Sequence, residues 1–391
     1  MTSISASEFN QRIEGSAGQK AVRHVRIGVD GRELAGGART GIGRFLREVL
    51  RAGASLEEFE FVLYGNKTTW LEPTLGNVQV RIVGGKWTQW WDQVSLPRQF
   101  ARDHIEVFLS PYYKCPLFAP CPVVLTIHDL FFIHYPDQRR PFYEFVMTSV
   151  ARLYAHRART IIADSEYSKR SIVDRLGVSP AKVTVIPVAV GAEFKPEPLT
   201  DVVRHHYRIA APYILYLGNF KPHKNVSRLL RAYAGLPEPL RATYQLVLGG
   251  GDRNYRPALE GLARSLGVAD RVLFPGQIED ADLPALYSGC ALFLLPSLDE
   301  GFGLPALEAM ACGAPVVASD RAALPEVVGE AALLVDPENE ASITMAMTGA
   351  LAAGETRENL RRRGLDRARE FSLDRTAGRV LELLREVGKS R

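Results

Sequence analysis

The stretch from Ala291 to Asp320, ALFLLPSLDEGFGLPALEAMACGAPVVASD, decides the fold that this sequence predicts. ALFLLPS and PVVAS are short apolar runs, typical of buried strands. Between them PALEAMAC favours a helix, with Pro305 suited to its first position and Gly313 to its C-terminal end. The pattern therefore predicts a strand–loop–helix–strand unit, the building block of parallel sheets that bind ligands at the carboxyl ends of their strands.

The loop of this unit, DEGFGL at residues 299–304, has the features of a ligand-binding loop. Gly301 and Gly303 let the backbone approach a ligand closely, and the start of the following helix favours an anion. Glu300 precedes the helix, and we expect Glu308 in its first turn, so both carboxylates flank one mouth. Because carboxylates accept hydrogen bonds from hydroxyls, a diphosphate that carries a sugar at each end would satisfy all these groups.

The segment EGFGLPALEAMACGAPVVAS resembles the Glu-x7-Glu signature of the retaining glycosyltransferases of family 4. This resemblance implies the α/β fold called GT-B, in which two doubly wound Rossmann-like domains face each other across a cleft. It also implies that Glu300 contacts the donor sugar, that Glu308 binds the ribose hydroxyls, and that the loop between them holds the donor. The loop positions in question are Gly301, Phe302, Gly303 and Leu304. Without the resemblance, a structural crossover with two solvated glutamates remains an alternative.

Composition indicates a soluble protein of two domains. The chain has 391 residues, of which 46% are hydrophobic and 24% charged. The formal net charge is +4 and no long Lys/Arg run occurs, so we expect no nucleic-acid partner. The 4 cysteines are scattered without a C-x-x-C pair, which argues against a zinc site and fits a reducing compartment.

The chain divides into a polar lead-in at residues 1–22, a first domain at 23–200 and a second domain at 206–373. The proline-containing stretch GAEFKPEPLT is the expected linker. By resemblance to GT-B proteins, a C-terminal helix at 374–391 returns to the first domain. The lead-in lacks the apolar core of a signal peptide, and no apolar run of about eighteen residues occurs. We therefore expect a cytoplasmic protein, and association with the inner face of the membrane is left open.

A glycine-rich loop, GRELAGGARTGIGRF, follows the predicted first strand VRIGVD and includes Gly36, Gly37, Gly41 and Gly43. The dinucleotide fingerprint G-x-G-x-x-G is absent, which argues against a dehydrogenase. The loop is similar to the TGIGRY-like loop of family 4 enzymes related to mannosyltransferases. That similarity implies that Gly41 and Gly43 lie near the donor phosphates.

His128 ends the predicted strand VVLTIHD, so it lies where α/β proteins bind ligands. The residues alone leave a structural role open; the resemblance to a TxHD-like motif implies contact with the donor sugar. Trp87, Trp90 and Trp91 share one face of a predicted helix at i, i+3 and i+4, which either packs on the sheet or faces an acceptor or membrane. A basic group forms either a solvated face or a membrane patch: Arg139, Arg140, Arg152, Arg157 and Arg159.

The segment YLGNFKPHKN places Lys221 and Lys224 between a strand and a helix, where cations can neutralise a diphosphate. Family 4 members commonly carry an Arg directly after the glycine and a Lys near the helix start. Lys224 matches the second position, whereas Asn219 occupies the first, and Lys221 is our candidate for the missing charge. LGGGD ends another predicted strand, which places Gly250 near the same cleft, and the resemblance assigns Gln277 and Ile278 to the segment that holds the nucleotide base.

The resemblance implies a retaining hexosyltransferase that moves a sugar, with GDP-mannose as the preferred donor, to a glycan or lipid-linked acceptor in surface polysaccharide synthesis. The catalytic candidates are Glu300, His128 and Lys224. Lys224 and the helix amides would stabilise charge on the departing nucleotide. No DxD-like motif ends a predicted strand, so we expect neither a metal nor any cofactor besides the nucleotide sugar.

Three alternatives stay open at this point: a UDP-sugar-dependent transferase, a GT-B sugar-nucleotide epimerase, and an inactive nucleotide-sugar-binding subunit. All of these functions need a pocket that a nucleotide sugar can enter. A pocket filled by the protein's own side chains would contradict them.

Overall fold

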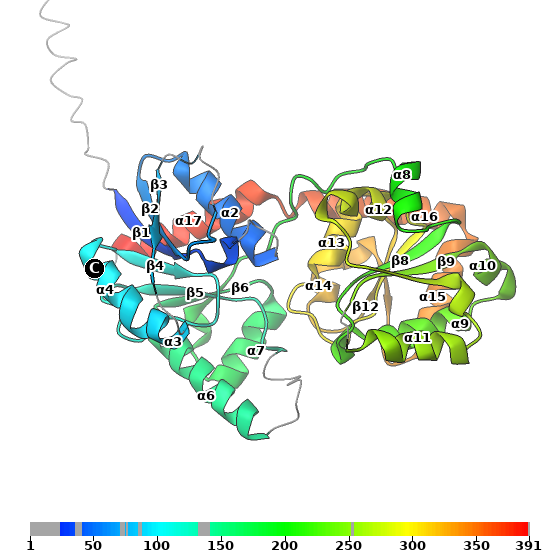
Figure 1. The fold of residues 1–391 in the computed structure, drawn as a ribbon, viewed down its shortest axis with the longest axis horizontal. Helices are drawn as coiled ribbons and strands as arrows, with labels where there is room; N and C mark the ends of the chain where they lie inside the picture. The colour runs from blue at the N-terminus through cyan, green and yellow to red at the C-terminus, as the bar shows by residue number, and fades with distance from the viewer. Residues whose placement is uncertain are drawn as a thin grey trace, which may run out of the picture.

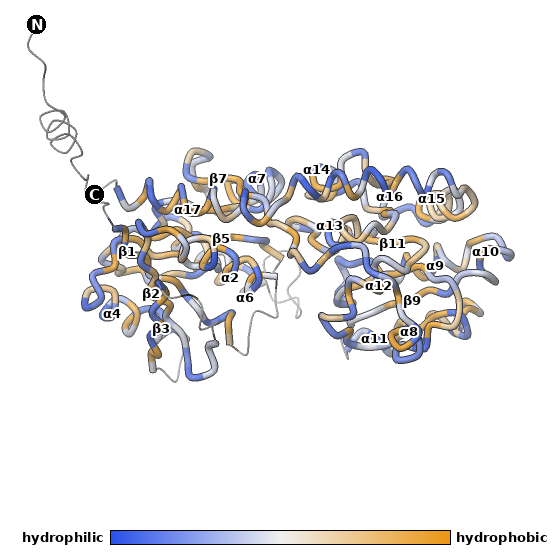
Figure 2. The backbone as a smooth tube through the Cα atoms, turned by 90° about the horizontal axis from the view of Figure 1, so that it is seen from above, coloured by the Kyte–Doolittle hydropathy of each residue, from blue (hydrophilic) through white to orange (hydrophobic). Residues whose placement is uncertain are grey.

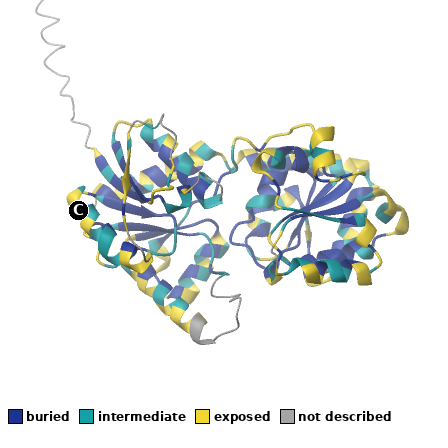
Figure 3. Cartoon of the chain, viewed as in Figure 1, coloured by how far each residue is buried: buried dark blue, intermediate teal, exposed yellow. Residues whose placement is uncertain are grey.

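The structure, a computed structural model, describes residues 24–35, 41–70, 75, 77–84, 88–131, 141–251 and 254–389, without the side chains of 141–143. Several predicted features lie outside the described residues: the lead-in at 1–22, Gly36, Gly37, Trp87, Arg139 and Arg140. The described chain forms two lobes side by side, each built around one sheet (Figure 1). The central strands of both sheets are buried, and the exposed residues lie mainly on the surrounding helices and loops and on the edge strand at Val78–Ile82 (Figure 3).

The sheet of the first lobe has seven parallel strands within the described residues, in the order β3-β2-β1-β4-β5-β6-β7. Its strands are β1 (Val25–Asp30), β2 (Phe59–Gly65), β3 (Val78–Ile82), β4 (Val107–Ser110), β5 (Val123–Ile127), β6 (Thr160–Ala163) and β7 (Val183–Val185). Its helices are α2 (Gly41–Ala54), α3 (Thr88–Trp90), a π-helix (Trp91–Ser95), α4 (Leu96–Arg102), α6 (Pro141–Arg157) and α7 (Glu166–Leu176), with 3-10 turns at Arg32–Leu34 and Pro180–Lys182. The order changes direction between β1 and β4, as in doubly wound folds.

The second sheet has six parallel strands in the part of the chain that the structure describes, in the order β10-β9-β8-β11-β12-β13. The strands are β8 (Tyr213–Gly218), β9 (Gln245–Gly250), β10 (Val272–Gly276), β11 (Leu292–Leu295), β12 (Val316–Ser319) and β13 (Leu333–Val335). The helices are α8 (Asp201–His206), α9 (Val226–Ala234), α10 (Glu238–Thr243), α11 (Arg256–Ser265), α12 (Leu283–Gly289), α13 (Leu304–Ala311), α14 (Leu324–Val328), α15 (Glu340–Ala352) and α16 (Gly354–Arg369). Short 3-10 turns lie at Pro222–Lys224, Ala269–Arg271, Asp280–Asp282 and Gly329–Ala331.

The last helix, α17 (Leu373–Lys389), packs on the first lobe although it follows α16 of the second. Val380, Leu381 and Leu384 are buried in the same cluster as the residues of β1 and β2. These side chains recur at helical spacing and give α17 one apolar face. The apolar face turns toward the sheet of the first lobe, beside α2 (Figures 1 and 2).

Both sheets confirm the predicted two-lobed GT-B architecture, whereas the predicted tryptophan face is wrong. Trp90 is 57% exposed and Trp91 only 5%. Trp90 and Trp91 are adjacent, and successive residues of a helix point about 100° apart, so one of them faces solvent while the other faces the core. Trp91 points into the core and donates from Nε1 to the carbonyl of Val83, 3.2 Å away.

Candidate active site

The loop between β11 and α13 takes a conformation that needs glycine. Gly303 precedes α13 with φ 97° and ψ 40°, in the left-handed region. A Cβ atom at Gly303 would also lie 2.4 Å from Cδ2 of Leu324. Leu304 and Pro305 are the first two helical residues, so Glu308 begins the second turn, and its predicted place in the first turn is wrong. Phe302 is buried and meets the ring of Phe371 edge-on, with 5.7 Å between the ring centroids.

Glu300 is buried in the loop and holds two hydrogen-bond donors on one oxygen. Its Oε1 accepts from Nζ of Lys224 and from Oγ of Ser297, each at 2.7 Å. Lys224 ends the 3-10 turn Pro222–Lys224, which follows β8. The structure thus brings together two of the three catalytic candidates, as an ion pair between neighbouring strand ends.

Glu308 receives one partner from each lobe. Nη1 of Arg44, from α2 of the first lobe, donates to Oε1 at 3.1 Å, and the Tyr287 hydroxyl donates to Oε2 at 3.0 Å. Burial raises the pKa of Glu308 to about 7, although Arg44 and Tyr287 act to lower it. The carboxylate that resemblance assigns to the ribose is therefore already hydrogen-bonded on both oxygens.

His128 follows β5 and is oriented by a buried carboxylate. Its Nδ1 lies 2.7 Å from Oδ2 of Asp164, which follows β6. Burial acts to lower the pKa of His128, but the charge and hydrogen bond of Asp164 outweigh burial and raise it. Nε2 of His128 is buried without a hydrogen-bond partner among the described residues, so this atom remains for a ligand hydroxyl.

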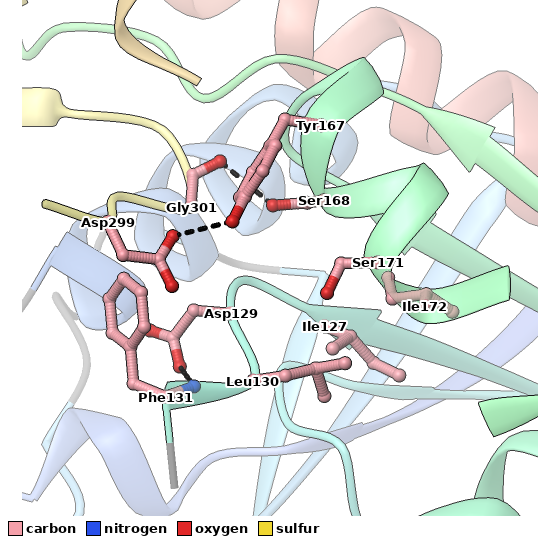
Figure 4. Close-up of a pocket in the computed structure, with 10 residues that line it drawn as sticks. All are labelled: Ile127, Asp129, Leu130, Phe131, Tyr167, Ser168, Ser171, Ile172, Asp299 and Gly301. Carbon is pink, nitrogen blue, oxygen red and sulfur yellow. Dashed lines mark hydrogen bonds between the residues drawn. The ribbon is translucent and has the colours of Figure 1, made fainter. Parts of the chain in front are cut away.

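The two lobes meet at the N-terminus of α7. The carbonyl of Gly301 accepts from the hydroxyls of Ser165 and Ser168, at 2.6 and 2.9 Å. The Tyr167 hydroxyl donates to Oδ1 of Asp299 at 2.8 Å (Figure 4). The contact is so close that a Cβ atom on Gly301 would lie 2.2 Å from the carbonyl oxygen of His128. Glycine at position 301 therefore allows the close contact between the lobes.

A crevice at this contact is too small to hold the donor. It encloses about 10 Å³ beside Asp129, Phe131 and Tyr167, which is room for about one water molecule (Figure 4). Asp129 is half-buried there, and burial raises the pKa of its carboxyl group. The crevice therefore belongs to the packing of the lobes.

The loop after β8 carries its charge on lysines. His223 is buried and stacked on Phe131 at 4.7 Å between ring centroids, and burial lowers its pKa to about 4, so the ring is neutral at pH 7. Asn219 is exposed, and its Oδ1 accepts from the backbone N–H of Lys221 at 3.2 Å. Asn219 therefore shapes its own loop and brings no charge where other family members have Arg.

The remaining predicted positions lie around the same strand ends. Gly250 has φ 89° at the end of β9, where a Cβ atom would lie 2.6 Å from the carbonyl oxygen of Gly218. Gly41 begins α2 against Leu304, since a Cβ atom there would be 3.3 Å from its Cδ2. Three positions differ in exposure: Gly43 and Ile278 are buried and Gln277 is exposed.

Several polar residues of the site escaped the sequence analysis: Arg44, Tyr287, Asp164 and Ser297. Arg44 directly follows Gly41-Ile42-Gly43, so its place in the glycine-rich loop was a signal that could have been used. Ser297 likewise ends the predicted strand ALFLLPS. Tyr287 carries no comparable sequence signal, and Asp164 follows the observed strand β6.

The predicted basic patch has structural partners. Arg157 donates to the carbonyls of Leu117 and Ala119, at 2.7 and 2.6 Å, and Arg152 donates to the carbonyl of Arg175 at 3.0 Å. Within the described ranges, no helix has both the length and the apolar character needed to cross a membrane. The same ranges hold no group of three or more His, Cys, Asp or Glu residues arranged for a metal ion.

Comparison with known proteins places each lobe in a family. Residues 208–367 match the model described as Glycosyl transferases group 1, and residues 39–194 match Glycosyltransferase Family 4. Over 252 residues the chain is 32% identical to O-antigen chain mannosyltransferase B of Escherichia coli, covering 64% of this chain and 66% of that protein. Over 278 residues it is 34% identical to the serotype-specific mannosyltransferase WbdA of Escherichia coli, covering 66% of this chain and 33% of WbdA.

Solved structures agree on the fold. Sucrose-phosphate synthase from Thermosynechococcus elongatus superposes with a TM-score of 0.75 at 22% identity, over 94% of this chain and 100% of that one. WaaG, a glycosyltransferase involved in lipopolysaccharide biosynthesis, superposes with a TM-score of 0.68 at 18% identity, over 92% and 99% of the two chains. At these identities the likeness concerns the fold alone. From the two family matches and this architecture, the chain belongs to the group 1 glycosyltransferases of family 4 and has their GT-B fold.

Proposed function

We propose that this protein transfers a hexosyl group from a nucleotide sugar to a glycan or lipid-linked acceptor, with retention of the anomeric configuration. GDP-mannose is the donor that we favour, because the relatives at 32% and 34% identity are mannosyltransferases. The words O-antigen and serotype in their names support a role in the synthesis of a surface polysaccharide. The chain spans 66% of the first relative and 33% of the second, so the substrates of these relatives are a proposal for this chain.

The proposal depends most on one observation: Glu300 and Glu308 stand before and after the start of α13, each hydrogen-bonded to a cation. The N-terminus of a helix favours a phosphate group. Carboxylates on both sides of it can accept hydrogen bonds from the donor sugar and from the ribose. Lys224 lies 2.7 Å from Glu300 and can stabilise a phosphate beside the sugar. A nucleoside diphosphate sugar matches this order of groups.

In the proposed reaction, the bond between the anomeric carbon and the phosphate oxygen breaks, and its electron pair stays on the nucleoside diphosphate. The acceptor hydroxyl oxygen bonds to the same face of that carbon, and its proton passes to the departing phosphate. Lys224 and the first amides of α13 stabilise the negative charge that develops on the phosphate. His128, oriented by Asp164 at 2.7 Å, forms a hydrogen bond with a sugar hydroxyl through Nε2. These fixed groups can perform the reaction without a divalent ion.

A panel of GDP-mannose, UDP-glucose, UDP-galactose and UDP-N-acetylglucosamine tests the proposal. We expect GDP-mannose to stabilise the protein against heat and to be hydrolysed slowly without acceptor, and we expect EDTA to leave this hydrolysis unchanged. A UDP-sugar in its place would correct the donor. An epimerised product would indicate an epimerase, and binding without turnover would indicate an inactive subunit. If the protein bound none of these donors, the proposal would be refuted.

A further inference from the structure

Arg44 stands where a ribose would have to bind. Its Nη1 lies 3.1 Å from Oε1 of Glu308, and the two side chains are only 18% and 8% exposed. The guanidinium also lies 5.4 Å above the ring of Phe194, within the range of a cation–π contact. Under the proposed function, ribose hydroxyls need the oxygen that Arg44 now occupies, so the donor must displace this guanidinium.

On the phosphate side of the site, the candidate cations are Lys221 and Lys224 of the loop after β8. Asn219 occupies the position where family 4 members commonly carry Arg, and its side chain accepts from the backbone N–H of Lys221 in the same loop. Lys224 is paired with Glu300 at 2.7 Å, so its charge is already shared with a carboxylate. A further cation would therefore help to balance the negative charge of a diphosphate.

Arg44 is placed to supply that charge. It lies in the first turn of α2, whose first residue, Gly41, contacts Leu304 at the start of α13. Glu308 is four residues along α13 from Leu304, a rise of about 6 Å. Rotation of the Arg44 side chain can therefore carry the guanidinium from Glu308 toward the start of α13 while α2 stays in place.

We propose that Arg44 changes partner when the donor binds: the ribose hydroxyls take over Glu308, and the guanidinium moves onto the diphosphate as a further cation. Arginine suits this role because its planar fork binds phosphate through two hydrogen bonds. Glu308 keeps three donors, the Tyr287 hydroxyl and two ribose hydroxyls, so its buried charge stays hydrogen-bonded. This inference rests on the proposed function and adds a residue of the first lobe to the donor site.

Calorimetric titration of the full-length protein with GDP, UDP, guanosine and uridine tests the exchange in wild type, Arg44→Gln and Arg44→Lys. In wild type we expect one nucleoside diphosphate to bind more tightly than its nucleoside. In Arg44→Gln we expect this preference to fall roughly 10- to 100-fold, the range for hydrogen bonds to charged groups. The nucleoside itself should bind the variant as well as or better than wild type, because Glu308 is released. Arg44→Lys should recover part of the preference, since it keeps the charge without the fork.

Arg51→Gln is the matched control, because Arg51 lies on the same helix, is 51% exposed and pairs with Glu48. It should leave the preference unchanged. If Arg44→Gln weakens nucleoside and diphosphate equally, or leaves both unchanged, the exchange is refuted while the proposed function stands. If wild type binds neither GDP nor UDP, the proposed function fails, and the exchange fails with it.

Discussion

Replacing Glu308 with glutamine is expected to remove a loss of stability that the wild type suffers as the pH rises. Burial raises the pKa of Glu308 from 4.5 to about 7 in the folded protein, whereas the unfolded chain ionises at 4.5. Between these values unfolding releases a proton, so the folded state loses stability with rising pH until both states are ionised above pH 7. Glutamine cannot titrate and still offers an oxygen to Tyr287.

The size of the effect follows from the pKa difference. Each pH unit between 4.5 and about 7 costs about 1.4 kcal/mol, so the whole window amounts to about 3 kcal/mol. For a lobe of about 170 residues, a change of about 1 kcal/mol moves the melting temperature by roughly 2–4 °C. Wild type should therefore lose roughly 6–12 °C relative to Glu308→Gln between pH 4.5 and 8. Arg44 stays charged throughout this pH range, and in the variant it lacks an ionic partner at every pH. The resulting loss of stability in the variant is therefore constant and does not affect how the melting-temperature difference changes with pH.

Differential scanning calorimetry of both proteins at pH 4.5, 5.5, 6.5, 7.5 and 8 measures the effect. We expect the difference in melting temperature between wild type and Glu308→Gln to change with pH. Glu358→Gln is the control, since Glu358 is 77% exposed, and its curve should run parallel to that of wild type. Parallel curves for wild type and Glu308→Gln would refute the reasoning, because they would show that burial does not disfavour the Glu308 charge.

Three further substitutions, with one control, test other parts of the site. Lys224→Ala should lower turnover about 10²- to 10³-fold, the scale for one group that stabilises developing charge, and a rate near wild type would reject that role. Gly301→Ala puts a Cβ atom 2.2 Å from the carbonyl of His128 and should hold the lobes apart, so both turnover and GDP affinity should fall, because Arg44 then no longer reaches the diphosphate. The control Gly349→Ala, which meets nothing within 4 Å in α15, should instead add up to about 1 kcal/mol of stability in urea denaturation. Asp164→Asn leaves burial as the main influence on His128, so its pKa should fall; an unchanged pKa in a proton NMR titration would contradict the assignment.

The strands and the donor-side loop could be predicted because their signals are local. Strands of a parallel sheet are buried on both faces, so β11 and β12 appear in the sequence as continuous apolar runs. Gly303 was expected to let a ligand approach, whereas the structure shows that its φ of 97° is a conformation only glycine adopts without strain. The tryptophan face was wrong because Trp90 and Trp91 are adjacent and point about 100° apart around a helix, so one faces solvent and the other the core.

The partners of the predicted carboxylates could not be found in this way. Arg44 and Glu308 are 264 positions apart and belong to different lobes, so their contact depends on how the lobes close. The same holds for Ser165 and Gly301, at 136 positions. The sequence indicated which residue types stand at the strand ends, but not that Arg44 of the first lobe is already hydrogen-bonded to Glu308, a contact that only the assembled lobes reveal.

The contact between the lobes is built from groups that can exchange partners. Gly301 meets serine hydroxyls, Asp299 meets a tyrosine hydroxyl and Glu308 meets Arg44. A contact that depends on hydrogen bonds and one ion pair can open at modest cost, because water replaces the lost partners. Under the proposed function, the donor competes with Arg44 for Glu308, so donor binding breaks one contact that holds the lobes together while the diphosphate gives Arg44 a new partner. The lobes would then be linked through the bound donor, and departure of the nucleoside diphosphate would return Arg44 to Glu308 and reset the site.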